Sequence, residues 1–177
     1  DHIRDIKPQG LKGNNISEEK AGQKALGLIK TITGQSGRIE NIRGVKGRIP
    51  GYTVELSSAA GHSYTIDISK KGGMPVNIIC SRSSNSINFS QKQLAGKGAD
   101  FLDKIGYPGM QATFSEIKEN IAYISYAYQQ DDILIYPDIV DLQIALDDGR
   151  ILALDALAYL TSHRKRQIPE KFIDSKE

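Results

Sequence analysis

The chain has 177 residues, of which 39% are hydrophobic and 25% charged, and its formal net charge at pH 7 is +2. This composition is typical of a globular protein, and so small a positive excess argues against a nucleic-acid partner. No apolar run approaches the roughly 20 residues that a membrane-spanning helix needs, and a single cysteine, Cys80, excludes an internal disulfide.

The first predicted element is a helix that begins after Ser17 and ends at Gly34. Ser17 can act as the N-cap, and apolar residues follow at helical spacing. Four extended stretches come next: residues 37–45, residues 51–58, and the two halves of a hairpin over residues 63–79.

The same order of elements then begins again. A second helix is predicted from Ser90, which with Gln93 has the sequence of a capping box, to Gly106. Strands are predicted over residues 110–119, 121–129 and a second hairpin, 139–155. The fold class is therefore predicted as α+β, with two tandem units that each pack one helix on an antiparallel sheet of about four strands. The predicted parts are a leading linker (1–15), the first unit (16–82), a linker (83–88), the second unit (89–163) and a tail (164–177).

Both hairpins are predicted to turn through a three-residue loop that ends in a left-handed glycine, Gly73 or Gly149. This register pairs aliphatic residues on one face of each hairpin. The expected pairs are Leu142 with Leu154, Ile144 with Leu152, Ile66 with Ile78, and Ile68 with Val76. In the first hairpin, Pro75 suggests an edge strand, because proline cannot donate to a ladder.

No arrangement of residues that breaks bonds is recognisable in the sequence. There is no nucleophile elbow and no phosphate-binding loop, and the three histidines lie far apart. Asp141 and Asp155 are expected beside each other on the face away from the aliphatics, where solvent explains them. We therefore predict no catalytic, metal-binding or cofactor-binding residues, no cofactor, and a chain that is not an enzyme.

Tyrosines and a basic run are the candidates for contact with a protein partner. Six of the eight tyrosines belong to the second unit. Tyrosine is favoured at protein interfaces, but it also has a good propensity for ordinary sheet surfaces, and the two interpretations have equal weight. The run at residues 162–167 could contact an acidic partner, or could be a solvated face. Unpaired sheet edges would also allow a homodimer. The candidate partner-binding residues are Tyr123, Tyr126, Tyr128, Tyr136, His163, Arg164 and Arg166.

An α-β-β-β-β unit with an Asp-x-Gly hairpin turn resembles the PepSY domain. The chain, most clearly after residue 87, is also similar to the YpeB family of spore-germination proteins, which have tandem PepSY domains. The residues that carry this resemblance are Gly106-Tyr107 with Met110, the tyrosine-rich strand 121–129, Ile135-Tyr136-Pro137-Asp138, Ala145-Leu146-Asp147 with Gly149, His163-Arg164 before Ile168-Pro169, and the opening Asp1–Ile3.

The resemblance implies a non-catalytic germination protein that binds and stabilises a cortex-lytic enzyme of the SleB type in the dormant spore. It places the protein in the spore, at the outer side of the inner membrane or in the cortex region. Two features of that family are expected outside this chain: an N-terminal membrane anchor, the only expected membrane contact, and a further PepSY copy. Two alternatives remain: a PepSY-type peptidase inhibitor or propeptide-like chaperone, and a peptidoglycan-acting enzyme that uses Asp138 or Asp141.

Overall fold

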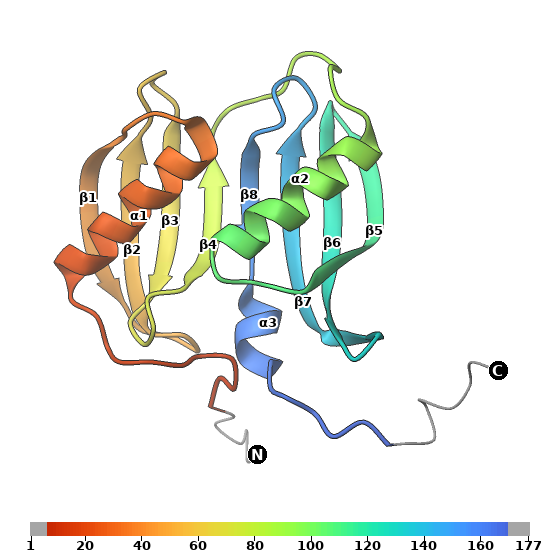
Figure 1. Cartoon of the computed structure of the whole chain (residues 1–177). Helices are drawn as coiled ribbons and strands as arrows, with labels where there is room; N and C mark the ends of the chain where they lie inside the picture. Colours follow the sequence, from red (N-terminus) through yellow and green to blue (C-terminus); the bar gives the residue numbers. More distant parts are fainter. Residues whose placement is uncertain (1–6, 170–177) are drawn as a thin grey trace, which may run out of the picture.

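The structure is a computed structural model, and it describes residues 7–169 (Figure 1). Its elements follow the predicted order, with one addition, a short third helix that the sequence analysis did not predict. The elements are α1 (Glu18–Thr33), β1 (Arg38–Val45), β2 (Gly51–Ser57), β3 (Ser63–Ser69), β4 (Pro75–Cys80), α2 (Gln91–Lys104), β5 (Met110–Lys118), β6 (Ile121–Gln130), β7 (Ile133–Ala145), β8 (Ile151–Asp155) and α3 (Leu157–Ser162).

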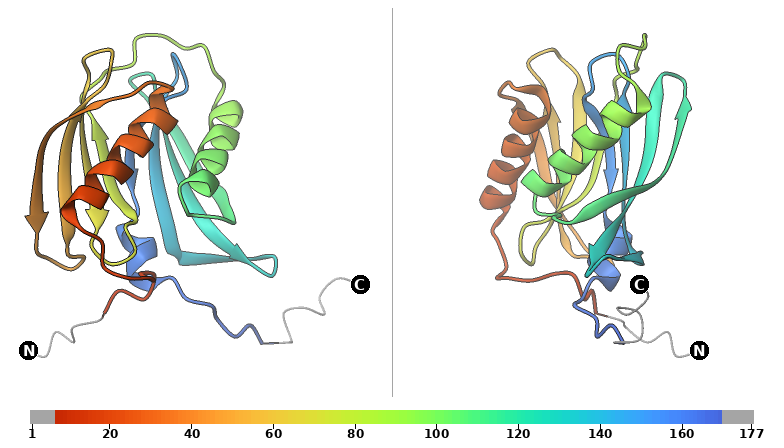
Figure 2. Two further views of the ribbon diagram at one scale, coloured as in Figure 1. Left: turned by 60° about the vertical axis from the view of Figure 1, so that its left-hand side comes forward. Right: turned by 45° about the vertical axis from the view of Figure 1, so that its right-hand side comes forward.

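All eight strands form one antiparallel sheet, in the order β1-β2-β3-β4-β8-β7-β6-β5. Helices α1 and α2 lie side by side on the same face of this sheet, and α3 lies at its lower end (Figures 1 and 2). The opposite face carries no helix among the described residues (Figure 2). We call it the open face. The prediction of tandem helix-and-sheet units is confirmed, and the two sheets are fused into one.

Local capping sets the limits of the two long helices. The Ser17 hydroxyl accepts from the Lys20 N–H at 3.1 Å, and Gly34 ends α1 with a φ of +74°. At the start of α2, both hydrogen bonds of the predicted capping box between Ser90 and Gln93 form, at 2.8 and 3.2 Å.

The register of the hairpins is confirmed in part. Leu142 pairs with Leu154, and Ile66 with Ile78, as predicted. However, Ile144 pairs with Ile151 instead of Leu152.

The reason is a β-bulge at the same place in both hairpins. Leu152 is the extra residue in β8, and Val76 is the extra residue in β4, so Ile68 pairs with Pro75. The Ala145 N–H donates to the Arg150 carbonyl, and the Ser69 N–H donates to the Met74 carbonyl. The loop that each of these bonds closes is therefore one residue longer than predicted.

The two units meet through β4 and β8, which pair antiparallel. Ile78 faces Leu154 at this junction, and these two residues hold the same position in the two hairpins. An approximate two-fold axis therefore passes between them. The prediction of an edge position at Pro75 is wrong, because β4 lies between β3 and β8. Pro75 is tolerated because it begins the strand.

The segment predicted as a leading linker packs on both units. The Gly10 N–H donates to the Leu160 carbonyl at 2.9 Å, Asn15 forms a bridge with Lys71, and Leu11 is buried. The rest of the predicted linker (1–6) and the end of the predicted tail (170–177) lie outside the described residues.

Candidate interaction surface

The open face gathers side chains from both units, because antiparallel pairing aligns alternate residues in rows across the sheet. One row contains Asn77, Asp155, Asp141, Ser125 and Phe114, from strands β4, β8, β7, β6 and β5. The next row contains Ile79, Ala153, Gln143, Tyr123 and Glu116. All of these residues except Glu116 line a groove of about 480 Å³.

Two large apolar side chains of this groove are open to solvent. Ile79 is 56% exposed and Phe114 is 60% exposed. Simple alternation along β5 would turn Phe114 towards the helices, on the side of Ala112. A β-bulge between these two residues turns it to the open face. For this reason, Phe114 was not among the predicted partner-binding residues.

Of the predicted partner-binding tyrosines, Tyr123 lies on the open face and lines the groove. Tyr136 is 60% exposed in β7. The prediction that Tyr126 binds a partner is wrong. Tyr126 is fully buried beneath α2, where its hydroxyl donates to the Ala95 carbonyl at 2.8 Å. Burial raises the pKa of Tyr126 well above its usual range. A partner cannot contact it on the folded chain.

Tyr128, His163 and Arg166 come together, but they face inwards around a buried carboxylate. Asp138 is fully buried, and Arg166 holds both of its oxygens at 2.7 and 2.8 Å. The His163 ring bonds to the same carboxylate at 2.8 Å and lies against Tyr128, with the ring centres 4.6 Å apart. Of the predicted basic residues, Arg164 is exposed.

A local feature of β7 brings Asp138 into the interior. Between the pairs of Tyr128 with Ile135 and Ala127 with Ile139, β7 has three unpaired residues, Tyr136, Pro137 and Asp138. Burial by itself would raise the pKa of Asp138, but hydrogen bonds from Arg166, His163 and Ser162 lower it below its ordinary value. This pairing anchors the chain that leaves α3, and it leaves Asp138 poorly suited to act as a base.

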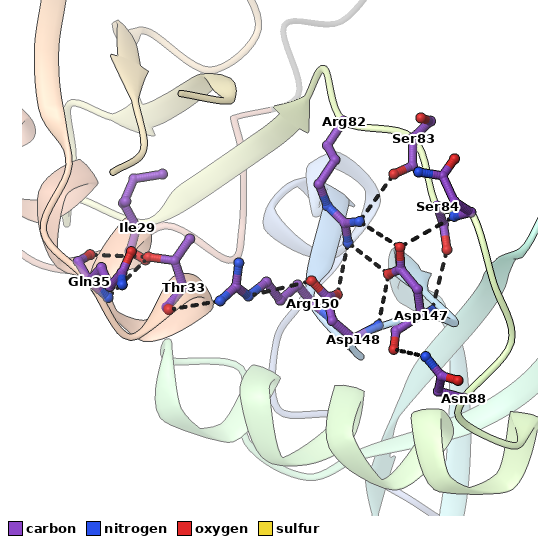
Figure 3. Close-up of polar contacts among 11 residues, drawn as sticks. Ile29, Thr33, Gln35, Arg82, Ser83, Ser84, Asn88, Asp147, Asp148 and Arg150 are labelled. Carbon is purple, nitrogen blue, oxygen red and sulfur yellow. Dashed lines mark hydrogen bonds and ion pairs between the residues drawn. The ribbon is translucent and has the colours of Figure 1, made fainter. Parts of the chain in front are cut away.

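A second polar cluster lies where the segment between β4 and α2 meets the β7–β8 loop (Figure 3). Arg82 contacts both oxygens of Asp147, at 2.8 and 3.0 Å, and one oxygen of Asp148, at 2.8 Å. The Arg82 guanidinium lowers the pKa of Asp147 to about 2. On the other side of the loop, Arg150 donates to the carbonyl of Thr33 at the end of α1, so this cluster ties the second unit to the first.

Asp141 and Asp155 stand directly opposite each other on the open face, as predicted. Asp141 accepts from the Ser125 hydroxyl, and Asp155 accepts from the Leu157 N–H at 3.0 Å. The described residues form no ion pair with either carboxylate. They also contain no group of three or more acidic, histidine or cysteine side chains placed to hold a metal ion.

Comparison with known proteins gives consistent matches. A family model described as YpeB sporulation, PepSY1 and PepSY2 domains matches residues 1–169. The sporulation protein YpeB of Bacillus subtilis is 32% identical over 178 residues, which cover 94% of this chain and 37% of the relative. That of Oceanobacillus iheyensis is 28% identical over 176 residues, which cover 99% of this chain and 39% of the relative. The chain thus spans less than half the length of these relatives.

A solved structure, the Bacillus megaterium YpeB C-terminal domain, is similar in fold, with a TM-score of 0.77 and 24% sequence identity. The match covers 89% of this chain and 70% of that chain. Among the described helices, none combines the length and the apolar character needed to cross a bilayer.

Proposed function

Because the chain belongs to the YpeB sporulation family, we propose that it is a non-catalytic germination module that binds a cortex-lytic enzyme of the SleB type. Binding would stabilise that enzyme in the dormant spore, outside the inner membrane. One observation carries the proposal: the open face presents an apolar groove that crosses the junction of the two units and that no described element covers.

Solvent exposure of this groove favours a protein partner. Large exposed apolar side chains that gather in one patch commonly mark interaction sites. Ile79 comes from the first unit, and Phe114 and Tyr123 come from the second, so fusion of the two sheets creates the groove. A partner that covered these side chains would gain apolar burial and would itself be shielded from proteases along the contact.

The proposal is tested with the purified chain and the purified lytic enzyme of the same organism. We expect the two to associate, and we expect the enzyme to survive a fixed protease treatment longer in the mixture than alone. The chain with both Ile79→Ser and Phe114→Ser should protect less, because it lacks the exposed apolar groups. Replacement of exposed Lys92 and Lys97 of α2 by serine, on the other face, is the control.

A second substrate separates protection from inhibition. If the chain slowed the same protease on an unrelated substrate such as casein, it would act as a peptidase inhibitor, and the proposed function would be wrong. It would also be wrong if the chain and the lytic enzyme did not associate.

A further inference from the structure

A second groove adjoins the first one on the open face, and the same two carboxylates line both. The first groove has a volume of about 480 Å³ and the second about 400 Å³. Asp141 and Asp155 are common to both. Since the first groove reaches Gln143 in β7 and the second reaches Ile139, the two form one track that runs along β7 past the carboxylates.

Apolar side chains lie at both ends of this track. At one end, Ile79 and the ring of Tyr123 lie in the row that follows the carboxylates and line the first groove. At the other end, Leu157, which is 39% exposed, lines the second groove with Ile139. The pattern along the track is therefore apolar, acidic and apolar.

The two carboxylates at the middle of the track have no positive partner within residues 7–169. Like charges directly opposite each other on a sheet are destabilising, and this pair is not neutralised within the described chain. Each side chain uses only its Oδ1 atom, to accept from Ser125 or from the Leu157 N–H. Arg48 lines the second groove but forms no ion pair with either carboxylate.

A second polar group in the track also has no partner in the part of the chain that the structure describes. The hydroxyl oxygen of Thr161, which lines the second groove, is buried and has no hydrogen-bond partner among the described residues. Buried hydroxyl groups are usually satisfied. An occupant with a polar backbone or side chain at this point could supply the missing bond.

We infer that this track binds an extended segment of the partner protein that carries a lysine or arginine between apolar side chains. The cation lies between Asp141 and Asp155, and the apolar side chains lie against Ile79 and Tyr123 at one end and against Leu157 at the other. This inference rests on the proposed function, because it takes the lytic enzyme as the source of the segment.

Charge-neutral variants of the two carboxylates test the inference. Asparagine at both positions (Asp141→Asn with Asp155→Asn) keeps an acceptor for Ser125 and for the Leu157 N–H. We expect this variant to bind the purified lytic enzyme about tenfold more weakly than the unaltered chain in low salt, with less dependence on salt. The control, Asp100→Asn with Asp103→Asn, removes the same charge from the exposed side of α2, and should bind as the unaltered chain does.

The outcomes separate the inference from the proposed function. If the unaltered chain binds the enzyme and the Asp141/Asp155 variant binds equally well, the inference is wrong and the proposed function stands. If the unaltered chain does not bind the enzyme, the proposed function fails.

The inference is then decided by a peptide of alternating leucine and charged lysine residues, acetylated only at its N-terminus. Its binding is followed by NMR, as changes in the backbone amide chemical shifts of β7 and β8. Changes that disappear in the Asp141/Asp155 variant would support the inference. No such shifts, or equal shifts with glutamate in place of lysine, would overturn it.

Discussion

Asp138 shows how a single carboxylate can be mistaken for a catalytic one. In the sequence it follows Tyr136 and Pro137, within an acidic second unit. The sequence alone therefore left it as a candidate for acid–base chemistry. In the fold it is fully buried, and Arg166, His163 and Ser162 all bond to it. A buried carboxylate with these partners serves to hold the chain that follows α3.

Replacing Arg166 by alanine should therefore destabilise the protein strongly. Arg166→Ala leaves Asp138 buried without its main counter-charge, and we expect the free energy of unfolding to fall by about 3 kcal/mol. Arg164→Ala is the matched control, because Arg164 is exposed and its loss should leave stability unchanged. Urea denaturation followed by circular dichroism measures both, and equal stability of the two variants would contradict this account.

Asp147 should make stability depend on acid pH. Its ordinary pKa is 3.8, and contact with Arg82 lowers the pKa to about 2 in the folded chain. The stabilisation from this contact is therefore complete above about pH 4 and is lost as the pH falls towards 2. Between these values, the free energy of unfolding should fall more steeply for the unaltered chain than for Asp147→Asn. Urea titrations at each pH measure these free energies. If the free energy of unfolding fell equally with pH in both proteins, this assignment would be wrong.

Helix α2 sits against the sheet through a glycine. A Cβ atom at Gly98 would lie 2.1 Å from the Tyr126 hydroxyl oxygen, whereas a Cβ atom at Gly96 would meet nothing within 4 Å. The close approach of α2 over Gly98 makes room for the buried ring of Tyr126. Its hydroxyl is fixed to the Ala95 carbonyl of the same helix.

Alanine at these two glycines should have opposite effects. Gly98→Ala forces α2 or Tyr126 to move and should lower the free energy of unfolding by about 1–3 kcal/mol. Gly96→Ala removes a flexible residue from an exposed helical position and should raise it by up to about 1 kcal/mol. Thermal or urea denaturation of both variants decides the matter. If both variants changed the free energy of unfolding in the same direction, contact with Tyr126 would not be the reason that position 98 requires glycine.

Elements defined by local signals could be predicted from the sequence, and those defined by pairing across the sheet could not. Ser17, Gly34 and the Ser90–Gln93 capping box act within a few residues, so the helix limits follow from them. The bulge that turns Phe114 outwards depends on how β5 meets β6, and alternation alone puts this residue on the wrong face. The contact of Gly98 with Tyr126 joins residues far apart in the chain, which is why Tyr126 was expected at the surface.

At the scale of the whole molecule, the two units share one sheet and one core. The buried hydrophobic residues of both units form a single cluster. The units are also joined by the β4–β8 pairing, by the Tyr107 hydroxyl, which donates to the Pro75 carbonyl at 2.7 Å, and by Arg150, which donates to the Thr33 carbonyl. The sequence predicts the repeat, but not this fusion, because Pro75 suggested that β4 was an edge.

A shared core predicts that the two units unfold together. In native-state hydrogen exchange with rising urea, the slowest amides of β2 and of β6 should converge on the same free energy of opening. Separate values, with one unit opening while the other stays protected, would show that the units are independent domains joined only by a short strand pairing.

The central proposal is that this member of the YpeB family binds a lytic enzyme through its open face. The most direct measurement places a photocrosslinking phenylalanine analogue either at Phe114, on the open face, or at Lys92, on α2 on the other face, and irradiates each chain with the purified enzyme. We predict a covalent adduct from position 114 and none from position 92. An adduct from position 92 alone, or from neither position, would contradict the claim.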